Sequence, residues 1–500
     1  MDAFVRLSEQ DNVITLTEDG AAGSVINGLT LRDDVPQGHK VATQHIADGA
    51  PLYKYAQRIG TANGAIEAGS HVHTHNLDFQ PVSTAYDFAT DAIAPAAPDR
   101  VDTFQGYRRA NGKVGTRNYI AVLTSVNCSA TAARYIAQAF TDADLGAYPN
   151  VDGVVAYVHG TGCGMSGKES FEALSRVMHG YAQHPNHAGV LLVGLGCEML
   201  QIDTLLERYG LQSGPLFQAM NIQDCNGLRA TVERGVALVR EMLPLANAVA
   251  RESCPASDLQ VALQCGGSDA WSGVTANPAL GYAVDLLAAQ GGTGVLAETP
   301  EIYGAEHLLT RRAVNRDVGE KLLDRIRWWE DYTARNGGSL DNNPSPGNKK
   351  GGLTTILEKS LGAAAKGGTT QLTGVYQYGE AVTEPGFAFM DSPGYDPVSV
   401  TGQIAGGCNL VVFTTGRGSA FGSKPAPCIK VSTNSQLYAR QQDDMDIDAG
   451  RVLSENLPVE TVGREIYARL LEVASGDPSH SEAYGLGDFE FVPWQIGATV

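Results

Sequence analysis

The feature that most constrains the fold is a repeated pattern of short apolar runs, each followed closely by a cysteine or a glycine. Three runs precede a cysteine: 119–126 with Cys128, 153–158 with Cys163, and 189–195 with Cys197. Such runs, rich in β-branched residues, are typical of buried strands. Helical patterns separate them, which predicts parallel strands joined by helices. In open sheets of this kind, ligands bind at the carboxyl ends of the strands.

Composition and the pattern of predicted strands and helices divide the chain into further segments. Residues 1–89 contain short strand-like runs separated by Gly, Asp or Pro and no long helical pattern, which predicts a small barrel or clip. The Ala/Pro-rich segment 90–105 predicts a linker. Strands that alternate with helices then predict two α/β domains with mostly parallel sheets, at 106–250 and 251–500.

Charge and composition exclude several classes of protein. A net charge of −19 lacks the basic surface that nucleic-acid binding requires. No run approaches the roughly 18–20 apolar residues of a membrane span, and the first residues lack the apolar segment of a signal peptide. The 8 cysteines are therefore expected to be reduced thiols. We expect a cytoplasmic protein that binds a small molecule, with no nucleic acid and no membrane as partner.

The cysteines at predicted strand ends are candidate metal ligands. Cys128, Cys163 and Cys197 would reach one edge of a sheet, where three thiolates suit a metal ion or an iron–sulfur cluster better than a disulfide framework. The alternative is structural, because cysteines often serve as small buried hydrophobic residues. The pattern recurs at Cys265, which two glycines, Ser268 and Asp269 follow.

A histidine-rich segment gives a second candidate centre. His71, His73 and His75 alternate with Val and Thr, so an extended strand would project all three from one face. Imidazoles bind first-row metals and act as acids or bases. His39 and Lys40, after a predicted turn, could join the same centre. The alternative is a solvated polar edge without chemistry.

Two glycine-rich loops in the last predicted domain are candidate anion sites. Asn348, Lys349 and Lys350 lie in a polar loop that leads into a predicted helix, whose N-terminus favours negative charge. Arg417 follows a predicted strand and could bind a carboxylate through paired N–H groups. Neither loop has the spacing of a nucleotide P-loop, so a carboxylate is the better ligand. An ordinary glycine-rich turn is the alternative for each.

Carboxylates also follow predicted strands, at Glu198, Asp269, Glu298 and Glu301. In so acidic a chain no single one is informative, but acid, thiol, Arg and Lys groups all fall at strand ends. The sequence has no Gly-x-Gly-x-x-Gly after a first strand, no nucleophile elbow and no His-Glu-x-x-His. These absences disfavour an NAD-dependent dehydrogenase, a serine hydrolase and a zinc protease.

Longer motifs follow one another through nearly the whole chain. They are GHK (38–40), HVHTHN (71–76), GYRRANGKVGTRN (106–118), HGTGCG (159–164), GLGCE (194–198), QCGGSDAWSGVTANPALG (264–281), ETPEIYGAEHLL (298–309), NPSPGNKKGGL (343–353) and FTTGRGS (413–419). In this order they resemble the altronate dehydratase / galactarate dehydratase family of sugar-acid hydro-lyases. The resemblance implies an N-terminal SAF-type β-clip domain and two α/β domains. It also implies dehydration of an aldonate or aldarate to a 2-keto-3-deoxy acid in hexuronate or aldarate catabolism, with a divalent metal, usually ferrous iron, and without NAD.

The resemblance leaves the substrate open. HVHTHN is similar to the altronate type, whereas 251–279 and NPSPGNKKGGL are similar to the galactarate type. A sulfolactate lyase shares the architecture as two chains, so fusion of the SAF domain favours a sugar acid here. A non-catalytic sugar-acid binding protein is the other alternative.

For a dehydratase we assign expected roles. They are catalytic for His39, His71, His73 and Lys349; substrate-binding for Lys40, Asp269, Asn348 and Arg417; and metal-ligating for Cys128, Cys163 and Cys197, or alternatively His71 and His73. A divalent metal would stabilise the enolate formed when the proton α to the carboxylate is removed, and would help hydroxide to leave. A His or Lys would accept that proton. The expected assembly is a homo-oligomer.

Overall fold

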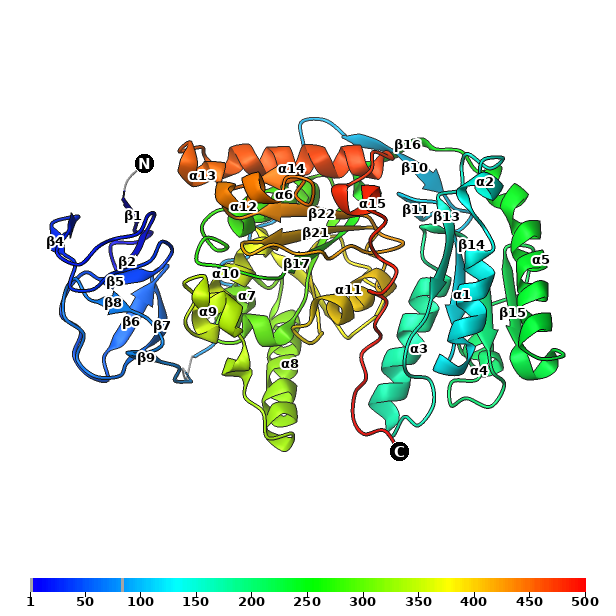
Figure 1. Ribbon diagram of the computed structural model, residues 1–500, viewed down its shortest axis with the longest axis horizontal. Helices are drawn as coiled ribbons and strands as arrows, with labels where there is room; N and C mark the ends of the chain where they lie inside the picture. Colours follow the sequence, from blue (N-terminus) through cyan, green and yellow to red (C-terminus); the bar gives the residue numbers. More distant parts are fainter. Residues whose placement is uncertain (1–2, 82–84) are drawn as a thin grey trace.

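The structure, a computed structural model, describes residues 3–81 and 85–500 and shows three domains in a row (Figure 1). The N-terminal domain (residues 3–81) lies at one end and the second domain (106–250) at the other. The third domain (251–500) lies between them. After the N-terminal domain, the chain therefore runs past the third domain to form the second domain, and then returns to form the third.

The N-terminal domain consists of small antiparallel sheets. One has the order β1-β2-β5-β8, another the order β6-β7-β9, and β3 pairs with β4. The strands are β1 (Phe4–Val5), β2 (Val13–Leu16), β3 (Val25–Ile26), β4 (Leu29–Thr30), β5 (Lys40–Ala42), β6 (Pro51–Lys54), β7 (Gln57–Ala62), β8 (His71–Val72) and β9 (Leu77–Asp78). One of its two hydrophobic clusters includes Ala305, Leu361 and Ala364 of the third domain. The predicted small β-rich domain is confirmed, and it shares part of its core with its neighbour.

The second domain contains a parallel sheet in the order β13-β12-β14-β15. Its main elements are β12 (Tyr119–Thr124), α1 (Ala130–Gln138), α2 (Asp142–Leu145), β13 (Gly153–Tyr157), α3 (Lys168–Ala182), β14 (His187–Gly194), α4 (Ile202–Tyr209), β15 (Phe217–Asn221) and α5 (Leu228–Asn247). Successive residues of a strand face opposite sides of the sheet. Accordingly, Ile120 and Val122 pack with α1 and α5, whereas Ala121 and Leu123 pack with α3 and α4.

The third domain contains a seven-stranded sheet in the order β19-β20-β18-β17-β21-β22-β23, in which all neighbours are parallel. The strands are β17 (Gln260–Cys265), β18 (Thr293–Leu296), β19 (Leu372–Tyr376), β20 (Gly386–Met390), β21 (Leu410–Thr415), β22 (Cys428–Ser432) and β23 (Ile447–Asp448). The helices are α6 (Ala276–Ala289), α7 (Glu306–Arg312), α8 (Arg316–Arg335), α9 (Pro346–Lys350), α10 (Ile356–Ala364), α11 (Asp396–Ala405), α12 (Ser435–Arg440), α13 (Arg451–Ser454), α14 (Val459–Ala474) and α15 (His480–Ala483). The two predicted α/β domains with parallel sheets are thus confirmed.

A small antiparallel sheet lies where the chain enters and leaves the second domain. It has the order β11-β10-β16 and consists of β10 (Thr103–Arg108), β11 (Val114–Gly115) and β16 (Glu252–Pro255). β10 begins inside the segment whose composition predicts a linker, because residues 103–106 pair with β16.

The segment after α15 runs between the third and second domains (Figure 1). The Trp494 ring stacks on Trp329, with 5.3 Å between ring centroids and 1° between planes. At its end, Val500 N donates a hydrogen bond to Gly164 O at 2.8 Å. This segment, residues 484–500, therefore connects the two α/β domains.

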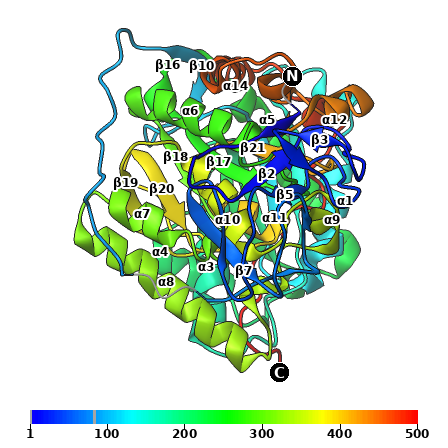
Figure 2. The same cartoon turned by 90° about the vertical axis from the view of Figure 1, so that its left-hand side faces the viewer.

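The N-terminal domain lies in front of the third-domain sheet in the view of Figure 2, and a buried ion triad joins the two. Glu358 on α10 accepts hydrogen bonds from Lys40 Nζ at 2.8 Å and from Lys54 Nζ at 3.0 Å. The side chains of Lys40 and Glu358 are fully buried. Burial opposes ionisation of Glu358, but the two ammonium groups outweigh it and hold the pKa of the carboxyl well below its usual range. Glu358 is therefore ionised in the folded protein, whereas burial lowers the pKa of Lys40 to about 8.

The triad predicts a large effect of a small substitution. Glu358→Gln would leave Lys40 and Lys54 buried without a counter-charge, and removing one partner of a buried pair costs about 3–5 kcal/mol. We expect a matching fall in the urea midpoint of unfolding, measured by far-UV circular dichroism. The control is Glu320→Gln, which breaks an exposed pair with Arg316 on α8 and should leave the midpoint unchanged. Equal midpoints for the two variants would contradict the role of the triad.

Candidate active site

The seven-stranded sheet has a topological switch point between β17 and β21, because the chain moves from β17 towards β18 on one side and from β21 towards β22 on the other. Ligands bind at such points, outside the carboxyl ends of the strands. The two loops that follow these strands are packed tightly together. Arg417 N donates to Gly267 O at 2.9 Å, and a Cβ on Gly416 would lie 2.1 Å from Asp269 Cγ.

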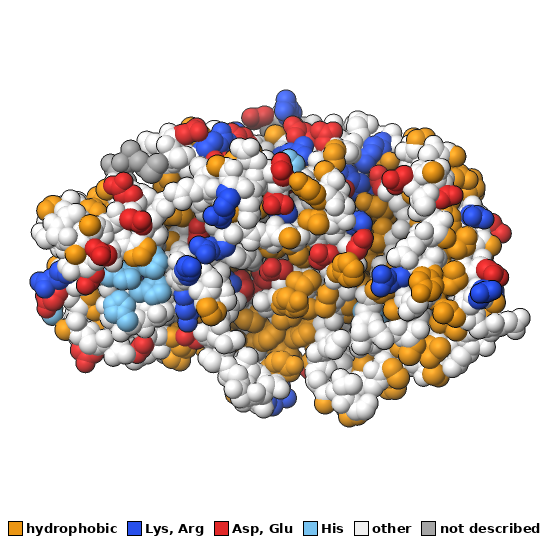
Figure 3. All heavy atoms as spheres, in the orientation of Figure 1, with side chains coloured by type: hydrophobic (Ala, Val, Ile, Leu, Met, Phe, Trp, Pro, Cys, Tyr) orange, Lys and Arg blue, Asp and Glu red, His pale blue; other side chains and the backbone are white. Residues whose placement is uncertain are grey.

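The N-terminal domain places histidines over this switch point. His39 Nε2 lies 3.3 Å from Lys350 O, and His73 Nε2 lies 2.9 Å from Lys349 O. The surface view shows the histidines gathered beside Lys and Arg side chains (Figure 3). Gly352 makes this approach feasible: its φ is +98°, and a Cβ there would lie 2.2 Å from Gly38 O. The contact between the domains thus runs through α9 and the glycines that follow it.

The histidines cluster as expected, but not on a continuous strand. The His71 ring centroid lies 5.7 Å from that of His73 and 5.4 Å from that of His75. The expected extended conformation is wrong beyond Val72, where β8 ends. Asn76 explains the ending, because its side chain accepts a hydrogen bond from His73 N and its backbone N donates to His73 O. A turn therefore gathers the imidazoles that the sequence pattern assigns to a strand.

The hydrogen bonds determine which ring nitrogens carry protons. A carbonyl oxygen only accepts, so His39 and His73 donate through Nε2 and keep Nδ1 unprotonated in their neutral forms. His39 Nδ1 then faces His71 Nε2 at 3.0 Å, and His73 Nδ1 faces the Thr74 hydroxyl at 3.1 Å. Burial lowers the pKa of His71 and of His73 to about 4. It also lowers the pKa of His39.

Two of these nitrogens fit a metal ion. Metal–nitrogen bonds of about 2.1 Å at a right angle place two ligand atoms about 3.0 Å apart, and His39 Nδ1 and His71 Nε2 are separated by 3.0 Å. The His39 Nε2 contact with a backbone carbonyl is the support that metal-bound imidazoles usually have. The histidines offer a close pair and not a triad, since the one set of three ligand atoms within 4.8 Å of one another in the described residues lies elsewhere.

Two predicted cationic residues are accessible beside the histidines. Lys349 is half-buried and Arg417 is exposed. A Cβ on Gly351 would lie 3.4 Å from Arg417 Cδ, and Gly351 adjoins the carbonyl that His39 contacts. The structure therefore brings Lys349 and Arg417 to the edge where the imidazoles lie.

The other predicted substrate-binding residues are buried and occupied by protein partners. Lys40 is bound to Glu358. Asn348 Nδ2 donates to Ser268 O at 2.8 Å. Asp269 accepts from Thr433 Oγ1 at 2.9 Å and from several neighbouring groups. In this structure these residues hold the loops of the site in place.

A buried charged cluster at the same sheet edge contains lysines that sequence reasoning missed. Cys265, Glu298 and Glu301 place ligand atoms within 4.8 Å of one another. Lys366 Nζ lies 3.0 Å from Cys265 Sγ, and Lys359 Nζ lies 2.5 Å from Glu301 Oε1. Each ammonium group therefore contacts a member of this set of potential ligands. The missed signal is the pair of lysines seven residues apart in the predicted helical segment that also carries Glu358.

The cluster has unusual proton affinities. Burial and the neighbouring Glu301 raise the pKa of Glu298 well above its usual value. Burial also raises the pKa of Asp396 to about 7, with Glu301 adding to the effect. Asn343 connects the cluster to the start of the α9 segment by donating to Glu301 Oε1 at 2.7 Å. Residues 343–352, which contain α9 and are here called the α9 segment, thus contact the buried cluster at one end and the histidines at the other.

The predicted cysteine ligands are not part of this site. Cys128, Cys163 and Cys197 belong to the second domain, at the opposite end of the molecule from the histidines (Figure 1). The His-based and Cys-based centres, which the sequence leaves as alternatives, are therefore separate places in this chain.

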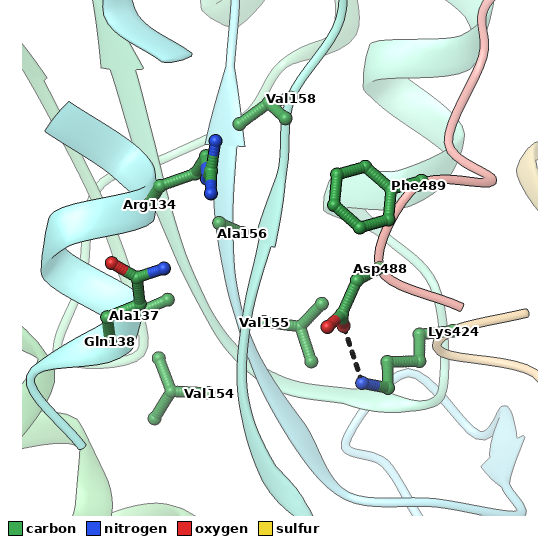
Figure 4. A pocket seen from close by; sticks show the side chains of 10 residues that line it. All are labelled: Arg134, Ala137, Gln138, Val154, Val155, Ala156, Val158, Lys424, Asp488 and Phe489. Atoms are coloured by element: carbon green, nitrogen blue, oxygen red, sulfur yellow. Dashed lines mark hydrogen bonds and ion pairs between the residues drawn. The ribbon is translucent and has the colours of Figure 1, made fainter. Parts of the chain in front are cut away.

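A cavity of about 290 Å³ also lies away from the histidines, between α1, β13 and the 484–500 segment (Figure 4). Valine and alanine side chains form much of its wall, and Asp488 in its lining is paired with Lys424 at 2.6 Å. It offers no arrangement of free acid and base groups.

None of the helices in residues 3–81 and 85–500 combines the length and the apolar composition of a membrane span.

Comparison with known proteins gives matches over most of the chain. Residues 2–80 match the altronate/galactarate dehydratase SAF domain, and residues 106–247 match the second domain of D-galactarate dehydratase/altronate hydrolase. Residues 256–499 match the C-terminal domain of D-galactarate/altronate dehydratase.

Individual relatives match over similar spans. Altronate dehydratase of Bacillus subtilis is 36% identical, covering 95% of this chain and 96% of the relative. Galactarate dehydratase (L-threo-forming) of Escherichia coli is 39% identical, covering 97% and 95%. The (2R)-sulfolactate sulfo-lyase subunit beta of Chromohalobacter salexigens is 34% identical, covering 78% and 96%. The chain belongs to the altronate/galactarate dehydratase family of hydro-lyases.

Proposed function

We propose that this protein dehydrates a sugar acid of the altronate or galactarate type to a 2-keto-3-deoxy acid, in the cytoplasm and without NAD. The observation that carries the proposal is the contact of His39 and His73 with the α9 carbonyls at the switch point, beside Lys349 and Arg417. Neutral imidazoles then lie beside a half-buried and an exposed cation, a combination that suits proton abstraction next to a carboxylate.

The cationic residues would bind and orient the substrate. A guanidinium presents paired N–H groups that match a carboxylate, so Arg417 would hold the carboxylate in one plane. Lys349, whose carbonyl contacts His73, would contribute a second positive charge to the same edge. Fixing the carboxylate in this way directs the neighbouring C2–H towards the imidazoles, and orientation of this kind supplies a large part of catalysis.

His73 is the best placed proton acceptor. Its Nε2–H is held by Lys349 O, and its Nδ1 lone pair faces only the rotatable hydroxyl of exposed Thr74. Rotation of that hydroxyl would free Nδ1 to accept the C2 proton, and the resulting imidazolium would remain bonded to the carbonyl. The same proton could then be returned to the departing C3 hydroxyl, which leaves as water.

His39 and His71 would hold a divalent metal, in agreement with the 3.0 Å separation of their nitrogens. When bound, such an ion supplies Lewis-acid stabilisation of the negative charge on the carboxylate and assistance to the leaving hydroxyl. With two protein nitrogens, the other coordination positions remain available to substrate oxygens and water. Ferrous iron is the ion we propose.

The direct test is an assay of the purified protein against a panel of aldonates and aldarates. We expect keto-acid formation from altronate or galactarate under anaerobic conditions with added ferrous iron and without NAD. (2R)-Sulfolactate is included because a sulfo-lyase subunit is among the relatives. Release of sulfite with no sugar-acid turnover, or no turnover of any compound, would refute the proposal.

Replacing the proposed base should affect chemistry more than binding. We expect His73→Ala to lower kcat by about 10²–10⁴-fold with little change in KM or in bound iron. His45→Ala is the matched control, because His45 is an exposed histidine of the same domain paired with Glu67, and it should retain full activity. Loss of iron together with activity in His73→Ala would instead identify His73 as a ligand.

Replacing the carboxylate-binding arginine should affect binding more than chemistry. Arg417→Lys keeps the charge but loses the paired N–H groups, so we expect a KM increase of about 10-fold with a smaller change in kcat. Arg335→Lys, at the exposed end of α8, is the control and should leave both constants unchanged. A lower kcat at unchanged KM would contradict a carboxylate-binding role for Arg417.

A further inference from the structure

Three cysteines are exposed in this structure, and all of them lie in the second domain: Cys128, Cys163 and Cys197. Cysteine is among the residues most often buried, so three exposed thiols in one domain are unusual. Cys225, in the same domain, is partly buried, and the four cysteines that remain are fully buried. The exposed thiols also have no part in the site described above.

The three exposed thiols lie on neighbouring loops that backbone hydrogen bonds hold together. Asn127 N, on the first loop, donates to Thr161 O on the second at 3.0 Å. Met199 N, on the third loop, donates to Gly162 O on the second at 3.1 Å. Each of these residues is within two positions of a thiol-bearing residue. The thiols are therefore carried by one connected surface.

The loops are closely packed and fixed. The φ of Gly162 is +104°, and a Cβ there would lie 2.3 Å from Ser125 O, so the first two loops approach as only glycine allows. On the third loop, Glu198 accepts from Gly196 N at 2.7 Å and from Leu195 N at 3.2 Å. A ligand at the thiols would meet a preformed site.

The position of these loops in the sheet is that of a ligand site. The order β13-β12-β14-β15 reverses direction next to β12: α1, after β12, covers one face and α4, after β14, covers the other. Such a reversal opens a crevice at the carboxyl ends of the strands. Beside it lies a cavity of about 260 Å³, lined by Asn127 and Gly160 from the first two loops and by residues of the 484–500 segment.

The positions of the thiols in this structure disfavour a single ion shared by all three. Thiolates bound to one metal at about 2.3 Å can lie no more than about 4.6 Å apart. The described residues contain one set of three potential ligand atoms within 4.8 Å of one another, and it does not include these thiols. A cluster distributes its ligands over several irons and so accepts a wider spacing.

We propose that Cys128, Cys163 and Cys197 bind a cubane iron–sulfur cluster through three thiolates, with the fourth iron left open to an external ligand at the adjacent cavity. Each thiol loses its proton on binding, and the protein atoms change no oxidation state. The second domain would then carry its own metal centre, at the opposite end of the chain from the histidines. The proposal stands independently of the proposed function, because iron and sulfide are measured without turnover.

The test uses the full-length protein, reconstituted anaerobically with sulfide and equal amounts of ferrous and ferric iron, which supply both oxidation states that the cluster contains. We expect about four irons and four acid-labile sulfides per chain beyond any iron held by the histidines, with the visible absorption of a cluster. Cys128→Ser, Cys163→Ser and Cys197→Ser should each lose the sulfide and the absorption. These are exposed positions, so circular dichroism should show an unchanged fold.

Two controls fix the assignment. Cys225→Ser alters the thiol that follows β15 at the same sheet edge and should retain the cluster. His39→Ala/His71→Ala removes the other proposed metal site and should also retain it. Iron without labile sulfide in the wild-type protein, or equal sulfide in all the cysteine variants, would overturn the proposal. Loss of the cluster in Cys225→Ser would overturn three-thiolate ligation.

Discussion

The buried carboxylate of Glu358 fixes the N-terminal domain on the third domain, and the geometry of the histidines depends on that contact. Lys40 is the residue after His39, so the ion pair that buries Lys40 also sets the position of the His39 ring. The imidazoles approach the α9 carbonyls only because the two domains meet as closely as Gly38 and Gly352 allow. The buried Lys40–Glu358 ion pair thus fixes the position of one domain relative to the other, and specificity of this kind is a role proposed for buried ion pairs.

The α9 segment connects the histidines to the rest of the site. The carbonyls of Lys349 and Lys350 contact the histidines, and Asn343 donates a hydrogen bond to Glu301 of the buried Cys265 cluster. The lysines in that cluster neutralise carboxylates that would otherwise repel an anionic ligand at the same sheet edge. The protein is strongly acidic overall, so this local balance of charge is what makes a sugar acid an acceptable partner.

Much of the fold follows from the sequence, because a fully buried parallel strand leaves an unambiguous apolar run. The runs at 119–126, 153–158 and 189–195 correspond to β12, β13 and β14. The site was less predictable. The histidine turn depends on Asn76, a local hydrogen bond that strand periodicity does not reveal.

Long-range burial was harder still to infer. Lys40 has the charge expected of a substrate ligand, but its partner Glu358 lies 318 residues away, and nothing local indicates the pairing. For a related reason, the sequence leaves the His set and the Cys set as alternative places for a centre without showing how far apart they are. Both sets lie at strand ends or beside them, and the sequence alone does not say that the third domain separates them.

The 484–500 segment has a consequence for biosynthesis. The loop that carries Cys163 is completed by Val500, which bonds to Gly164 and is translated long after the strands around it. Domains generally fold as they emerge from the ribosome, N-terminal first. The second domain can acquire its sheet early, but its loop edge stays unfinished while the third domain is being made. That edge of the second domain is therefore completed only after the third domain has been translated.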